Sequence, residues 1–139
     1  MAKGRTVKHQ DPLKLIFALP LPPAVLGPNV RAHHMAEARA RKKYRNDCYL
    51  LTLEAMAEAK VRSRVPLRRF VLSAIYFYPV SRRRDPDNLT ALLKTPIDAL
   101  RDAGLVIDDH ADHMRLVSVD WAVDKDHPRL MLDVEEVTE

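Results

Sequence analysis

The sequence predicts an α+β fold. It should be a single domain in which a small mixed or antiparallel sheet packs with a long N-terminal helix and a second helix carrying an Asp-x-Asp-Asn motif. Residues 32–60 are rich in Ala, Leu, Glu and Arg without Pro or Gly, which is typical of a long helix. Several short β-branched, aromatic or alternating segments flank this helix and favour strands. The 139 residues suffice for one domain with its own core.

The first part of the chain is expected to supply a tail, a strand and the long helix. Residues 1–12 are polar and basic and should form a disordered tail, so the folded domain would span residues 13–134. A strand at 13–19 should end in Leu19-Pro20-Leu21-Pro22-Pro23, because proline donates no ladder hydrogen bond. The helix at 32–60 is basic in its first half and apolar in its second half.

The extended segments of the second half should complete the sheet. Residues 70–78 are β-branched and aromatic and form the clearest strand. Residues 105–107 are expected to be a short buried strand or an extended turn. Residues 114–123 and 129–134 alternate in polarity around a turn, which predicts an antiparallel hairpin. Residues 135–139 are interpreted as a solvated acidic tail.

The second helix has recognisable start and stop signals. Asp85 suits the N-cap and Pro86 suits the first helical position, where no amide hydrogen is needed. Apolar side chains then recur at helical spacing until Gly104, which suits the C′ position. Pro96 removes one backbone hydrogen bond, so we expect the helix to bend near Leu92.

The charge is divided between the two parts of the chain. Residues 1–84 hold 18 of the 23 Lys and Arg and 5 of the 19 acidic residues, whereas residues 85–139 hold 5 basic and 14 acidic residues. The first part is expected to meet an anionic partner, and the second part concentrates carboxylates as a metal site does. The alternative is an unevenly charged, solvated surface.

The sequence favours a cytoplasmic protein with no membrane partner. No segment approaches transmembrane length. A single cysteine, Cys48, excludes an internal disulfide and a cysteine-based zinc site and suits a reducing compartment. Residues 3–19 superficially resemble a secretion signal, but the apolar run is short, contains Lys14 and precedes several prolines.

Two pairs of aspartates suggest a site for a hard cation. Asp85 and Asp87 lie at the start of the second helix, and Asp108 and Asp109 follow its end. Helix capping explains Asp85 alone, but it does not explain two matched pairs. Because magnesium prefers oxygen ligands, we expect residues 105–107 to return the second pair to the start of the helix.

Basic residues surround the predicted acidic site. Lys94 can reach back towards Asp87 or pair with Asp98, four residues on. The arginine run before Asp85 and the basic half of the long helix suit phosphate contact, although a solvated helix face is the alternative. The candidate DNA-binding residues are Arg82, Arg83, Arg84, Arg39, Arg41, Lys42, Lys43 and Arg45.

The order of these motifs resembles the RusA family of Holliday-junction resolvases. The motifs are Arg82-Arg83-Arg84-Asp85-Pro86-Asp87-Asn88, Lys94 followed by Asp98-Ala99-Leu100, Ala103-Gly104 and Asp108-Asp109. The resemblance spans Leu13 to Val134 and also includes Leu19-Pro20-Leu21-Pro22-Pro23 and Lys43-Tyr44-Arg45. The spacing departs from the family pattern, because Lys94 follows Asp87 by seven residues rather than four.

The resemblance implies a metal-dependent endodeoxyribonuclease. Asp85, Asp87 and Asp109 would bind the metal and form the catalytic set with Lys94, and Asp108 is a further candidate ligand. The implied cofactor is Mg2+, with Mn2+ as the alternative. The implied substrate is branched DNA, a four-way junction that is resolved into nicked duplexes in recombination and repair.

The resemblance also implies a homodimer. The apolar second half of the long helix is the segment of the sequence that fits such an interface. The protein would be a cytoplasmic enzyme encoded by a bacterium or by a phage in a bacterial host. Two alternatives stay open: a RusA-fold protein that binds branched DNA without cutting it, and a metal-dependent nuclease that acts on flaps, forks or RNA.

Overall fold

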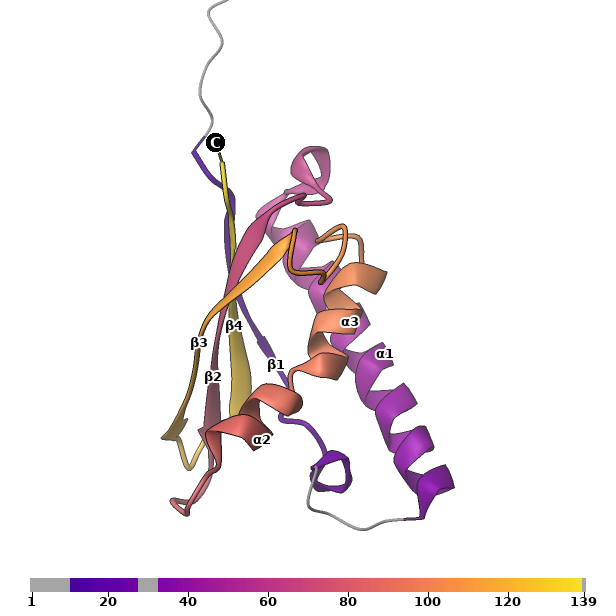
Figure 1. Cartoon of the computed structure of the whole chain (residues 1–139), viewed down its shortest axis with the longest axis vertical. Coiled ribbons are helices and arrows are strands. Elements are labelled where there is room, and N and C mark those ends of the chain that lie inside the picture. The colour runs from indigo at the N-terminus through magenta and orange to yellow at the C-terminus, as the bar shows by residue number, and fades with distance from the viewer. Residues whose placement is uncertain (1–10, 28–32, 139) are drawn as a thin grey trace, which may run out of the picture.

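A four-stranded mixed sheet with helices on one face forms the protein, as Figure 1 shows. The computed structural model describes residues 11–27 and 33–138. The strands are β1 (Lys14–Leu19), β2 (Phe70–Tyr78), β3 (Met114–Val123) and β4 (Arg129–Glu136). The helices are α1 (His34–Ala59), α2 (Pro86–Ala91) and α3 (Lys94–Asp102), with the short 3-10 helices η1 (Ala24–Leu26) and η2 (Arg62–Arg64). The predicted α+β class with a mixed sheet is confirmed.

The sheet has the strand order β1-β4-β2-β3, which corrects the predicted hairpin. β2 pairs with β4 in antiparallel orientation and with β3 in parallel orientation, so it lies between the two strands expected to be partners. The connection between β3 and β4 passes the end of β2, where Asp124 N donates to the Tyr78 carbonyl at 2.8 Å. Alternating polarity identified β3 and β4 as strands. It does not tell which strand each of them pairs with in the sheet.

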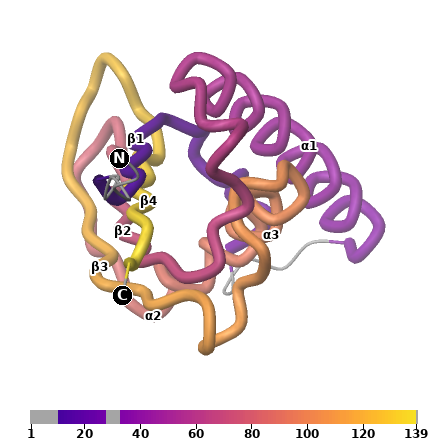
Figure 2. The backbone as a smooth tube through the Cα atoms, turned by 90° about the horizontal axis from the view of Figure 1, so that it is seen from above, coloured from indigo at the N-terminus to yellow at the C-terminus, as the bar shows by residue number. Residues whose placement is uncertain are grey.

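The core lies between the sheet and the helices (Figure 2). Alternate residues of β1, β2 and β4 are buried, as in a sheet covered on one face only. On α1 the buried residues are Tyr44, Cys48 and Thr52, which are spaced four residues apart and form one narrow stripe. Burial raises the pKa of the Cys48 thiol to about 12, so this cysteine is an inert part of the core.

The single bent helix expected after Asp85 is instead two helices, and the break between them falls near Leu92, where the bend was predicted. α2 ends at Ala91, and α3 begins at Lys94. Pro96 is therefore the third residue of α3. Because the first amide groups of a helix have no intrahelical partner, the missing N–H costs little in that turn. Gly104 follows α3 with a φ of 80°, the left-handed conformation expected at C′.

The C-terminal acidic residues do not all belong to a solvated tail. β4 continues to Glu136, two residues beyond the predicted strand, and Glu136 Oε1 accepts hydrogen bonds from Leu13 N and Arg64 Nη2, both at 3.0 Å. Residues 1–10 of the predicted N-terminal tail lie outside the described residues, as does Glu139. None of the helices in the described part of the chain is both long enough and apolar enough to cross a bilayer.

Candidate metal and nucleic-acid site

Asp85 and Asp87 lie where β2 leads into α2. Asp85 is the N-cap of α2, and its Oδ1 accepts a hydrogen bond from Asp87 N at 2.9 Å. Pro86 occupies the first turn, as predicted. Asp87 is exposed, and within residues 11–27 and 33–138 its carboxylate has no hydrogen bond or ion pair. Capping therefore accounts for Asp85, whereas the structural contribution of Asp87 is limited to the favourable position of its charge in the first turn of the helix.

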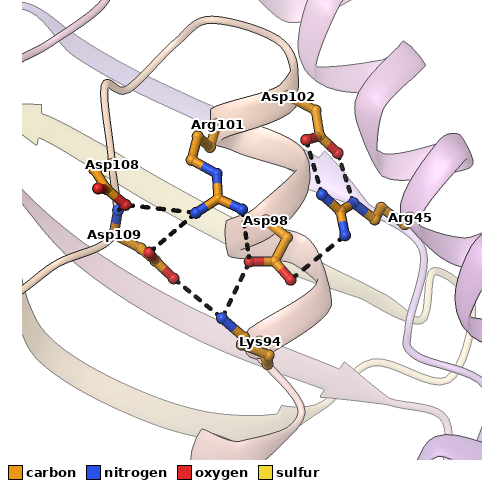
Figure 3. Close-up of polar contacts among 7 residues, drawn as sticks. All are labelled: Arg45, Lys94, Asp98, Arg101, Asp102, Asp108 and Asp109. Atoms are coloured by element: carbon orange, nitrogen blue, oxygen red, sulfur yellow. Dashed lines mark hydrogen bonds and ion pairs between the residues drawn. The ribbon is translucent and has the colours of Figure 1, made fainter.

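Lys94 is the first residue of α3 and contacts two aspartates (Figure 3). Its Nζ lies 3.3 Å from Asp98 Oδ1 and 3.4 Å from Asp109 Oδ2. The hydrogen bond to Asp98 and the nearby charges of Asp98 and Asp109 raise the pKa of Lys94, which keeps it a cation. Of the two predicted partners, Asp98 is confirmed.

Arg101 holds the Asp108–Asp109 pair, and sequence reasoning missed it. Its Nη1 lies 3.4 Å from Asp108 Oδ1 and 3.5 Å from Asp109 Oδ1. Arg101 follows Lys94 by seven residues, or about two helical turns, so this spacing could have placed both cations on one face of α3. The Asp109 N–H, which donates to Asp108 Oδ1 at 2.7 Å, lowers the pKa of Asp108 most, and Arg101 lowers it further.

An extended segment brings these two aspartates alongside α3. Leu105 and Val106 are buried, and Val106 forms a parallel bridge with Leu67. Leu67 N donates to the Leu105 carbonyl at 2.8 Å, and Ile107 N donates to the Leu67 carbonyl at 3.0 Å. The extended turn expected at residues 105–107 is confirmed. It brings Asp109 to Lys94 at the start of α3, whereas the sequence analysis expected it to reach the helix start at Asp85.

The two members of each aspartate pair are linked by a hydrogen bond: Asp87 N donates to Asp85 Oδ1 at 2.9 Å, and Asp109 N donates to Asp108 Oδ1 at 2.7 Å. In the described part of the chain, no three His, Cys, Asp or Glu side chains are placed together to hold a metal ion. The structure therefore does not show the predicted convergence of Asp85, Asp87 and Asp109. The donor chemistry fits magnesium, which commonly takes one or two protein carboxylates and completes its shell with water and substrate phosphate.

The arginine run before α2 divides into free and packed residues. Arg82 and Arg83 are exposed, and neither has an ion pair with any described residue. The Arg84 guanidinium stacks 3.5 Å from the centre of the Tyr78 ring and lies 5.9 Å from that of Trp121. This contact, which the sequence analysis did not anticipate, fixes Arg84 against the sheet.

The basic residues of α1 also differ in their surroundings. Arg41 pairs with Glu37 at 2.6 Å, and Lys43 pairs with Asp47 at 2.7 Å. Arg45 makes two hydrogen bonds to Asp102, at 2.6 and 2.9 Å, and so joins α1 to α3. The two residues that are exposed and form no ion pair with the described residues are Arg39 and Lys42. Of the basic set on α1, these two are the best placed to meet an external anion.

No family model matches the chain, and no curated protein matches it. The RusA resemblance therefore depends on the motifs and spacings of the sequence itself.

Proposed function

We propose that the protein is a metal-dependent endodeoxyribonuclease of the RusA type that resolves four-way DNA junctions. The observation that carries the proposal is the exposed Asp87 carboxylate, which has no partner among the described residues. It lies in the first turn of α2, four residues after Arg83, and Arg82 and Arg83 are themselves without an ion pair among the described residues. A free carboxylate and free arginines this near in the chain suit a site where a cation and a phosphate bind together.

In this proposal Asp85, Asp87 and Asp109 hold Mg2+ or Mn2+, with Asp108 as a further ligand. The metal supplies an activated water and stabilises negative charge on the leaving oxygen. Lys94, kept protonated by its carboxylate neighbours, adds positive charge near the scissile phosphate. Arg82 and Arg83 bind adjacent phosphates and reduce the repulsion between the aspartates and DNA.

A homodimer would match the two-fold symmetry of the junction. Two large apolar side chains on the second half of α1, Leu50 and Leu53, are 53% and 36% exposed. An interface built on this part of α1 would cover both and would give the particle two active sites. Leu50→Glu should then convert the dimer into a monomer, measured by light scattering on a sizing column.

A second function is favoured by the position of Lys94 in the sequence and by its ion pairs with aspartates. Lys94 is three residues further from Asp87 than in the family pattern and is paired with Asp98 and Asp109. This pairing favours a protein that binds branched DNA without cutting it. A labelled junction incubated with wild-type protein and Mg2+ or Mn2+ separates the two functions, because binding without nicks at any metal concentration supports the second.

The Asp87→Asn variant tests the nuclease proposal at one side chain. It removes a ligand charge and keeps the size, so cleavage should fall by orders of magnitude while junction binding persists or tightens. Asp126→Asn, an exposed carboxylate in the turn after β3, is the matched control and should cleave normally. Unchanged cleavage by Asp87→Asn would show that Asp87 is not a ligand. Comparing junction, fork, flap, duplex and RNA substrates would identify the preferred substrate.

A further inference from the structure

A pocket of about 490 Å3 lies at the end of the sheet where β2 leads into α2. Its walls come from three segments: the proline-rich turn at 21–27, the end of β2 with the arginine run, and the inner side of α2. Figure 1 shows the turn after β1 and α2 at the same end of the sheet. The volume is in the range of small-ligand sites, which are about 300–1,000 Å3.

Two tyrosine hydroxyls hold the walls of this pocket in place. Tyr44 Oη donates to the Pro20 carbonyl at 2.7 Å, which ties the proline-rich turn to α1. Tyr76 Oη donates to the Leu89 carbonyl at 2.7 Å, which ties α2 to β2. Burial raises the pKa of both hydroxyls, so both stay protonated and remain donors. The pocket is therefore built before any ligand arrives.

The lining combines planar groups with one amide and a charged rim. Tyr78 and Arg84 both line the pocket, and the Arg84 guanidinium covers one face of the Tyr78 ring at 3.5 Å, so the guanidinium is the planar group left to meet a base. Nucleobases stack on aromatic rings and on guanidinium planes. Asn88 adds a side chain that both donates and accepts hydrogen bonds, and the exposed Arg82 and Arg83 stand at the rim.

We propose that this pocket binds one unstacked nucleobase of a DNA strand whose phosphates contact Arg82 and Arg83. The inference rests on the proposed function, since it names a subsite of that DNA-binding surface. The apolar walls exclude water from the base, and the Asn88 side-chain amide forms hydrogen bonds with the edge of the base. The rim arginines Arg82 and Arg83 complement the negative charge of the strand's phosphates. A purely apolar ligand would leave both rim cations unused. Asp85 also lines the pocket, so the bound base lies next to the metal site of the proposed function.

An NMR titration with a single-stranded trinucleotide tests the pocket without relying on cleavage. The wild-type protein should show saturable shifts of the Leu21 and Leu92 methyl groups and of the Asn88 side-chain amide. Ala24→Trp fills the pocket from an exposed position and should weaken this binding roughly tenfold, the size expected for loss of one stacked base. Ala57→Trp, at an exposed position on α1, should bind like the wild type.

Two results would overturn the pocket assignment. One is a set of shifts confined to the arginine run with the methyl groups unmoved, and the other is equal affinity in Ala24→Trp and wild type. Junction cleavage by the same proteins keeps the two proposals apart. If the protein cleaves the junction but the Leu21 and Leu92 methyl signals do not move, the pocket assignment is wrong and the nuclease proposal stands. If those signals move but the protein neither binds nor cleaves the junction, the nuclease proposal is wrong and the pocket is a nucleotide-binding site.

Discussion

Lys94 Nζ lies 3.4 Å from Asp109 Oδ2, so the first residue of α3 is joined to the loop that follows α3. The same ammonium group is shared with Asp98, one turn along the helix. Lys94 is thus a cation held between two carboxylates in the proposed active site, although the sequence separates it from Asp109 by a complete helix and an extended turn.

Lys94→Met should abolish cleavage with little loss of stability. The change removes the charge and keeps much of the apolar stem. The Lys94 side chain is 69% exposed, and exposed ion pairs contribute about 0–1 kcal/mol, so the free energy of unfolding should change by no more than that. Urea unfolding and a junction-cleavage assay measure the two effects. Cleavage at the wild-type rate would remove Lys94 from the catalytic set.

Arg101→Gln should strengthen the binding of a divalent cation. Arg101 contacts both Asp108 and Asp109, so a metal ion must compete with its guanidinium for the same oxygens. The Arg101 side chain is 40% exposed and its pairs are screened, so we expect about a two- to fivefold gain in Mn2+ affinity, measured by electron paramagnetic resonance.

The matched control for this variant is Arg115→Gln, on the exposed side of β3. It removes the same charge from the protein without breaking a contact to Asp108 or Asp109, and it should leave the Mn2+ affinity unchanged. An equal gain in both variants would mean that net charge, rather than release of Asp108 and Asp109, governs binding. No gain in Arg101→Gln would place the metal elsewhere.

Replacing Arg39 and Lys42 together with Gln should reduce the salt dependence of junction binding. Each phosphate contact adds about 0.9 to the slope of log K against log salt, so losing two contacts should lower it by about 1.8. A second double variant, Arg41→Gln with Lys43→Gln, removes cations already paired within α1 and should change the slope less. Equal slopes in the first variant and the wild type would show that α1 does not contact DNA.

Local signals in the sequence were sufficient to predict most of the elements. Asp85 and Pro86 identified the start of α2, and Pro96 indicated the break before α3, because caps and prolines act within one helical turn. The order of the strands was not predictable in this way. β2 separates β3 from β4 through contacts between segments far apart in the chain, and alternation of polarity is the same whichever strand lies alongside.

Residue type and spacing selected the aspartate motifs and Lys94 as candidates, and helical spacing predicted the pair of Lys94 with Asp98. Contacts between segments far apart in the chain could not be predicted in this way. Arg101 meets Asp108 across a turn whose path is set by the bridge between Leu67 and Val106, a contact that no local pattern encodes. The stacking of Arg84 on Tyr78 likewise depends on how the chain leaves β2.

The ion pair between Arg45 and Asp102 should make part of the stability sensitive to acid. The hydrogen bond from Arg45 lowers the pKa of Asp102 below its ordinary value of 3.8. The unfolded chain, with the ordinary pKa, then binds a proton more readily than the folded chain. The contribution of this ion pair to the free energy of unfolding is complete above pH 3.8. It is lost as the pH falls through the lowered pKa of Asp102 in the folded protein.

A double-mutant cycle of Asp102→Asn and Arg45→Gln measures this contribution. The two side chains are 33% and 41% exposed, so each single variant should lose about 1 kcal/mol or less at pH 7, and both should show a shallower decline in stability below pH 4. Urea unfolding at pH 7 and pH 3 provides the free energies. Both variants break the Arg45–Asp102 pair, and Arg45→Gln also removes a 3.8 Å ion pair with Asp98. The double variant should therefore lose less stability than the sum of the two single losses. Fully additive losses would mean that Arg45 and Asp102 do not stabilise each other.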